Sequence, residues 1–116
     1  MNVYVFGNEY LGEDSLAASV SKYLHANIVH CRSPEDLLEA DDETITILDV
    51  AQGATKPVII KLEQLKTRSL MSMHDFDLSF FLNLMKELGQ EKHIRIIGIP
   101  QQGNPVEIAR EVQDLL

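Results

Sequence analysis

The chain reads Thr-Ile-Thr-Ile-Leu-Asp over residues 44–49, an apolar and β-branched run that ends on an aspartate. This composition predicts a buried strand over residues 44–48 that runs into Asp49. A carboxylate directly after an apolar strand is costly to bury unless another group pairs with it. Asp49 is therefore a candidate functional residue, although the aspartate at a strand end can also bond only to neighbouring loop amides.

Four further apolar runs predict strands on either side of this stretch, over residues 3–6, 27–30, 57–62 and 94–99. A proline opens the run over residues 57–62, which favours a place at the edge of the sheet.

Helical patterns separate these strands. Apolar residues at helical spacing predict a helix that begins near residue 16, and its buried face comprises Leu16, Val20, Tyr23 and Leu24. Ser33 before Pro34 and Asn104 before Pro105 each predict a capped helix start. Another amphipathic helix is expected from about residue 75 to Gly89.

Alternation of strands and helices predicts an α/β fold, in which a mostly parallel sheet is covered on both sides. The chain has 116 residues and shows no repeat, low-complexity tract or linker. We therefore expect one domain over residues 1–116.

Charge and composition exclude several classes of function. The chain carries 18 acidic and 10 basic side chains, a formal net charge of −8, and so lacks the basic footprint that binding to nucleic acids or anionic membranes requires. No apolar run approaches the roughly 20 residues that span a bilayer. The single cysteine, Cys31, cannot form an internal disulfide and is expected to be a small buried hydrophobe. Without signal-peptide composition at residues 1–7, a cytoplasmic location is expected.

Polar side chains should gather where the strands end, because ligands of open α/β sheets bind outside the carboxyl ends of the strands. The loop after the first strand offers Glu13 and Asp14, the third strand offers Asp49, and the segment after the fourth offers His74. Two carboxylates and one imidazole can make a site for nickel, zinc, manganese or iron. Asp14 could equally cap the following helix, and a lone histidine such as His74 is more commonly structural.

Several of these motifs together resemble the hydrogenase maturation protease family. Gly7-Asn8 followed by Glu13-Asp14 is similar to the family's Gly-Asn-x-x-x-x-Asp-Asp/Glu signature. The stretches over residues 47–51 and 73–78, with Asp49 and His74, resemble its strand-ending aspartate and its histidine motif, and residues 96–100 resemble its last core strand.

The resemblance implies a three-layer α/β/α sandwich with a mixed five-stranded sheet. It also implies an endopeptidase that cuts the C-terminal extension from the large-subunit precursor of a nickel-iron hydrogenase, once nickel is inserted. Asp14, Asp49 and His74 would then contact the nickel that the precursor carries, and Asp14 and Asp49 would be the catalytic carboxylates.

Two other functions stay open at this stage. A phosphoacceptor receiver domain also has an acidic pair after its first strand and an aspartate at the end of its third. Here, however, the acidic pair lies seven and eight residues after Phe6, and no lysine follows the last strand at Pro100-Gln101. A homologue that binds the precursor without cutting it is the other alternative.

Overall fold

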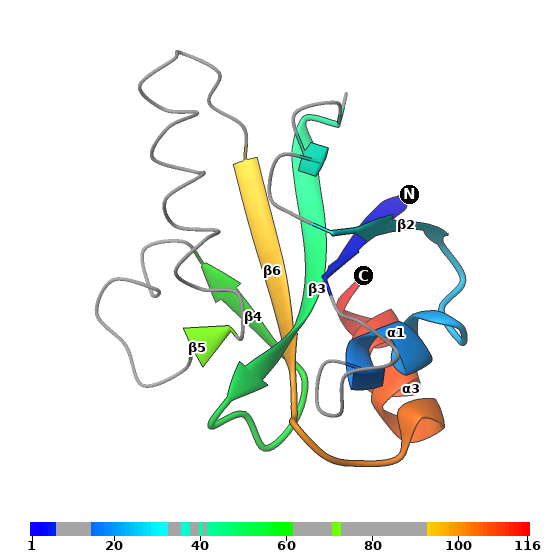
Figure 1. Ribbon diagram of the computed structural model, residues 1–116, viewed down its shortest axis with the longest axis vertical. Coiled ribbons are helices and arrows are strands. Elements are labelled where there is room, and N and C mark those ends of the chain that lie inside the picture. Colours follow the sequence, from blue (N-terminus) through cyan, green and yellow to red (C-terminus); the bar gives the residue numbers. More distant parts are fainter. Residues whose placement is uncertain (7–14, 33–35, 38–39, 41, 62–70, 73–92) are drawn as a thin grey trace.

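The computed structural model describes residues 1–6, 15–32, 36, 37, 40, 42–61, 71, 72 and 93–116. Within these residues, five strands form a mixed sheet in the order β2-β1-β3-β6-β4 (Figure 1). The strands are β1 (Asn2–Phe6), β2 (Asn27–Cys31), β3 (Thr44–Gln52), β4 (Val58–Lys61) and β6 (His93–Ile99). A short strand, β5 (Met71–Ser72), pairs with β3 outside this order.

The directions of the strands confirm the predicted sheet. β2, β1, β3 and β6 run parallel to their neighbours, and β4 at the edge is antiparallel to β6. The edge position of β4 agrees with the proline, Pro57, that precedes it. The sheet is therefore mostly parallel and mixed, with five principal strands.

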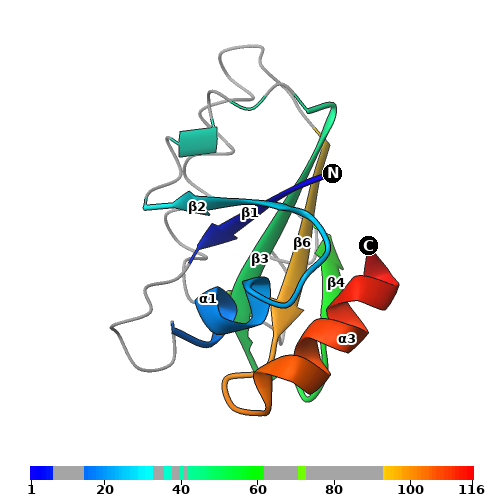
Figure 2. The ribbon, with the colours of Figure 1, turned by 90° about the vertical axis from the view of Figure 1, so that its right-hand side faces the viewer.

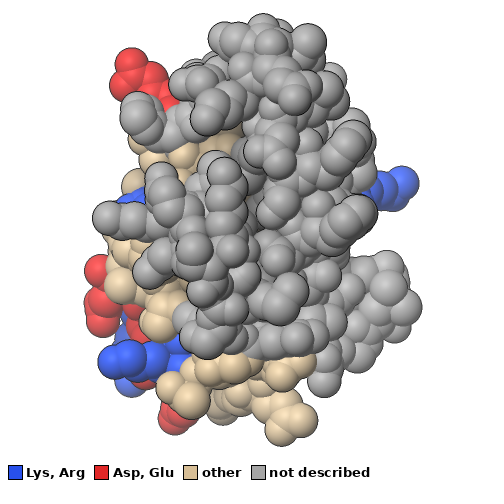
Figure 3. All heavy atoms as spheres, turned by 90° about the vertical axis from the view of Figure 1, so that its left-hand side faces the viewer, with Lys and Arg blue, Asp and Glu red and all other residues tan. Residues whose placement is uncertain are grey.

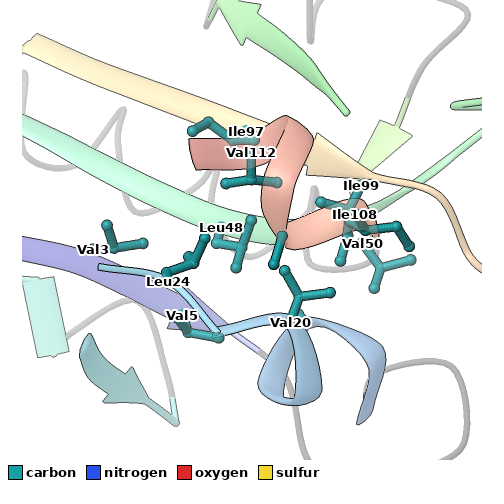
Figure 4. Packing of buried hydrophobic residues seen from close by; sticks show 12 residues of the cluster. Val3, Val5, Val20, Leu24, Leu48, Val50, Ile97, Ile99, Ile108 and Val112 are labelled. Atoms are coloured by element: carbon teal, nitrogen blue, oxygen red, sulfur yellow. The ribbon is translucent and has the colours of Figure 1, made fainter. Parts of the chain in front are cut away.

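Side chains alternate between the two faces of the sheet, and both faces bury apolar residues. The first face packs against two helices, α1 (Ser15–Ser21) and α3 (Pro105–Leu115), which lie on the same side of the sheet (Figure 2). The fully buried residues on this face come from β1, β3, β6 and both helices. They are Val3, Val5, Ala17, Val20, Leu48, Val50, Ile97, Ile99 and Val112 (Figure 4).

The opposite face buries a second apolar cluster. Its strand residues are Tyr4, Phe6, Cys31, Ile45, Ile47, Ala51, Ile60 and Ile96. Leu37 and Ala40, which lie between β2 and β3, pack against it. The helix predicted over residues 75–89 lies outside the described residues, so the second helical layer of the sandwich stays a prediction.

α1 is shorter than the apolar spacing predicted. The helix ends at Ser21, and the backbone amides of Tyr23 and Leu24 bond to the carbonyls of Val20 and Ser21, three residues back, at 3.1 and 3.2 Å. This tighter turn changes the angular spacing of the side chains. Leu24 is buried as predicted, but the prediction for Tyr23 was wrong, since 54% of its surface is exposed.

α3 begins where the sequence predicts. The Asn104 side-chain oxygen accepts hydrogen bonds from the backbone amides of Val106 at 2.9 Å and Glu107 at 3.3 Å, and Pro105 takes the first helical position. Ile108 and Val112 are buried against the sheet. Neither α1 nor α3, the helices of the described residues, has the length and apolar character that crossing a membrane requires.

Candidate active site

Asp49 lies inside β3 rather than after it. The strand continues to Gln52 because two ladders extend past Leu48. Asp49 and Val50 pair with Gly98 and Ile99 of β6, and the last two residues of β3 pair with β5. The prediction that the strand ends at residue 48 was therefore wrong, although the aspartate still lies near the carboxyl end of the strand.

The Asp49 side chain is almost fully buried, with 1% of its surface exposed. Because side chains alternate along a strand, it points to the face that carries Ile47 and Ala51, opposite α1 and α3. The backbone amide of Val50 donates a hydrogen bond to Asp49 Oδ1 at 2.8 Å. The expected bond to a neighbouring amide is thus present, and it holds a carboxylate that is withdrawn from solvent.

The position of Asp49 in the sheet is one where α/β proteins bind ligands. The chain leaves β1 toward β2 on one side and returns to β3 on the other, so the topological switch point lies between β1 and β3. Val5 of β1 pairs with Leu48 of β3, which places Asp49 one position further along, beside the end of β1 at Phe6. Ligands of such sheets bind outside the carboxyl ends of the strands at this point.

Gly98 of β6 is the other neighbour of Asp49, and sequence reasoning missed it as a site residue. A Cβ atom built on Gly98 would lie 2.7 Å from Ala51 Cβ and 2.7 Å from Ile60 Cδ1. A glycine inside an apolar strand is the sequence signal of such a close approach. The absence of a side chain there lets β3, β6 and β4 pack tightly beside the carboxylate.

The other two predicted metal contacts, Asp14 and His74, lie outside the described residues, as do Glu13 and Asp75. Their neighbours in the chain are described. α1 begins at Ser15, directly after Asp14, and packs against β1 and β3. β5 places Ser72, two residues before His74, opposite Ala51. The residues that the structure describes contain no group of three or more His, Cys, Asp or Glu side chains that could hold a metal ion.

Cys31 is unsuited to nucleophilic chemistry. It is a free cysteine with 5% of its surface exposed, and burial, reinforced by the charge of Asp36, raises the pKa of its thiol to about 11. A reactive cysteine needs a depressed pKa and access to solvent. The expectation of a small buried hydrophobe is confirmed.

The surface on the side of β4 and β5 shows no segregation of charge in its described part. Figure 3 shows acidic and basic side chains interspersed there.

Taken together, the chain is an α/β protein with a buried carboxylate at the switch point of a mixed sheet. Two solved structures share this fold along nearly the whole chain. The hydrogenase maturating endopeptidase HybD from E. coli is similar with a TM-score of 0.68 and 16% identity, over 99% of this chain and 89% of that protein. A hydrogenase 3 maturation protease is similar with a TM-score of 0.65 and 18% identity, over 97% of this chain and 85% of that protein.

No family profile matches the sequence, and no curated protein is significantly similar to it. The fold of the chain is therefore the fold of hydrogenase maturation endopeptidases, as the sequence motifs implied.

Proposed function

We propose that this chain is an endopeptidase that removes the C-terminal extension from the nickel-loaded large-subunit precursor of a nickel-iron hydrogenase. The observation that carries the proposal is the buried carboxylate of Asp49 at the β1–β3 switch point. It occurs in a fold shared along 99% of the chain with a hydrogenase maturating endopeptidase. The single cysteine fits a cytoplasmic setting for this reaction.

In the proposed complex, Asp14, Asp49 and His74 contact the nickel that the precursor carries. Nickel accepts imidazole and carboxylate ligands, so these side chains suit the ion. The metal is part of the substrate and serves as the recognition element that brings the scissile peptide bond to the site. Asp49 is prepared for this role because its carboxylate is already out of water, where a cation would bind it more strongly.

Two routes to hydrolysis are compatible with this arrangement. A carboxylate acts as the general base that takes a proton from the attacking water, or nickel polarises the scissile carbonyl as a Lewis acid. In both routes the Val50 amide orients Asp49 by its bond to Oδ1.

The described neighbours of Asp14 and His74 in the chain lie against the strands that border the switch point. α1 starts one residue after Asp14 and packs against β1 and β3, on the face of the sheet opposite the Asp49 side chain. β5 brings the chain to the end of β3 two residues before His74, which supports a place for His74 near the strand that holds Asp49.

Sheet topology argues against the receiver-domain alternative. Receiver domains of the flavodoxin-like class have the strand order 2-1-3-4-5. In this chain the principal strand that comes fourth in sequence, β4, lies outside β6 at the edge and runs antiparallel to it.

The site assignment is tested by removing the charge of each carboxylate without changing its shape. Asp14→Asn and Asp49→Asn should each lower processing of nickel-loaded precursor by about 10²-fold or more, the usual size of a lost general base. Asp49→Asn keeps the Oδ1 acceptor for the Val50 amide, so the fold should be retained. The measurement is the rate of precursor cleavage on a gel, with circular dichroism as the check on folding.

Asp114→Asn is the matched control, because Asp114 is an exposed aspartate of α3 on the other side of the sheet. This variant should cleave like the unaltered protein. Unimpaired cleavage by Asp14→Asn or Asp49→Asn would refute the site. Tight binding of nickel-loaded precursor with no cleavage by the unaltered protein would identify the non-cleaving homologue instead.

A further inference from the structure

Gly98 leaves space beside Asp49 on the face of the sheet that carries the carboxylate. The two residues pair in register across β3 and β6, so they belong to the same face. β4 flanks β6 on its other side (Figure 1), and Val58 of β4 pairs with Gly98 from there. A Cβ atom at position 98 would therefore lie next to the Asp49 side chain, about 5 Å away, the spacing of neighbouring strands.

A side chain from the edge strand fills this space. Ile60 Cδ1 lies 2.7 Å from the position that a Cβ atom of residue 98 would have, and Ile60 Cγ1 lies 3.6 Å from it. Ile60 pairs with Ile96, two residues before Gly98, so its side chain reaches diagonally over β6 toward β3. It is 2% exposed, although β4 is at the edge of the sheet. The terminal methyl group of Ile60 thus takes the place beside Asp49 that a side chain of β6 would otherwise occupy.

The other described neighbours of Asp49 on this face are apolar and closely packed. Ile47 and Ala51 flank it along β3, Phe6 lies beside it at the end of β1, and all three belong to one buried cluster. Asp49 Oδ1 accepts the Val50 amide at 2.8 Å, a bond that requires one orientation of the side chain. Because core side chains pack without voids, a methyl group on the β6 side restricts rotation of the carboxylate away from that orientation.

We infer that Ile60 is a positioning residue for Asp49: its Cδ1 methyl group keeps the carboxylate in the orientation that the Val50 amide sets. The inference rests on the proposed function, because Ile60 would influence cleavage through Asp49. Catalytic groups must be held close to their productive geometry, and a misplacement of about 1 Å can cost roughly 10²-fold in rate. Ile60 supplies packing and no chemical group of its own.

The test removes the one methyl group that carries the inference. Ile60→Val deletes Cδ1 and keeps Cγ1. Ile45→Val is the matched control, because Ile45 is also fully buried in the same cluster but lies four residues before Asp49 on β3, where it pairs with Ile94. Both variants should fold and lose similar stability, since each loses one buried methyl group.

Two measurements follow Asp49 in these variants. The first is NMR of the Val50 amide proton in labelled protein. In Ile60→Val its signal should move upfield and its exchange with D2O should become faster, because the bond to Asp49 Oδ1 is formed less of the time. The second is cleavage of nickel-loaded precursor, for which Ile60→Val should lower kcat by about 10-fold and leave KM unchanged. Ile45→Val should match the unaltered protein in both measurements.

Two results would overturn the inference. One is a Val50 amide signal that is the same in Ile60→Val and in the unaltered protein, or that moves equally in the two variants. The other is a kcat of Ile60→Val equal to that of the unaltered protein. Failure of the unaltered protein to cleave would instead refute the proposed function, and the Val50 amide would still decide whether Ile60 holds Asp49 in place.

Discussion

Asp49 is a charged side chain that the sheet holds almost entirely out of water. Among the buried residues of the described chain, the other polar ones are Ser21 and Thr46, whose hydroxyls are neutral. Burying a carboxylate is costly unless it is paired, and an apolar residue of similar size at this position would commonly be as stable or more so. The Val50 amide that donates to Asp49 Oδ1 offsets part of this cost, and in the proposed function the nickel ion of the precursor would offset more.

Cys31 gives a prediction at the same scale, because its pKa differs between the folded and unfolded chain. The thiol has a pKa of about 11 in the folded protein and about 8.5 in an unfolded chain. Between these values the unfolded chain loses the proton while the folded chain keeps it, so stability falls as pH rises. Tyr4, whose pKa is also raised, acts in the same direction.

We expect the free energy of unfolding to fall by about 2 kcal/mol through Cys31 alone between pH 8 and pH 10. Urea denaturation at the two pH values measures it. Cys31→Ala is the control, since it removes the thiol at both pH values and should show a smaller decrease. An equal decrease in the two proteins would contradict the assignment to Cys31.

At the scale of elements, most strands can be predicted from the sequence, because each is an uninterrupted run of apolar or β-branched residues. β1, β2 and β6 lie within one residue of the predicted ranges at each end. The direction of β4 could not be predicted, because an apolar run has the same pattern in a parallel and in an antiparallel strand. Pro57 indicated only that this strand lies at the edge of the sheet.

β5 could not be predicted either. Its two residues, Met71 and Ser72, carry no periodic pattern and exist as a strand only by pairing with the end of β3. That same pairing extends β3 over its last two residues, Ala51 and Gln52, while the ladder with β6 extends it over Asp49 and Val50.

The close approach of β3, β6 and β4 beside Asp49 gives the prediction at this scale. Gly98→Ala should destabilise the protein by about 1–3 kcal/mol, the usual cost of overpacking a core. The new methyl group would lie 2.7 Å from Ala51 Cβ, which cannot rotate away, and 2.7 Å from Ile60 Cδ1, which can. Thermal or urea unfolding measures the loss.

A double-mutant cycle tests whether this loss of stability comes from the contact between the new methyl group and Ala51 Cβ. In Gly98→Ala/Ala51→Gly the destabilisation should be smaller than the sum of the two single losses, because the second change removes the atom that is in conflict. Strict additivity, or a Gly98→Ala variant as stable as the unaltered protein, would contradict the tight packing at this position.

At the scale of the whole molecule, the sequence predicted the fold class, which the structure confirms, whereas the role of Asp49 in the site stays a prediction. The mixed, mostly parallel sheet and its likeness to two maturation proteases agree with the motifs around Asp49. Asp14 and His74 stay predictions, since they lie outside the described residues. Sequence alone could not show that Asp49 is buried at the switch point, because burial depends on the order in which the strands assemble.

The central claim is that the protein cleaves its substrate only when that substrate carries nickel. The most direct measurement compares cleavage of one hydrogenase large-subunit precursor in its nickel-loaded and nickel-free forms, by mass spectrometry of the released C-terminal peptide. We predict that the peptide is released from the nickel-loaded form alone, and that Asp49→Asn lowers the rate of this release by about 10²-fold or more. Equal release from both forms, or release from neither, would contradict the proposed function.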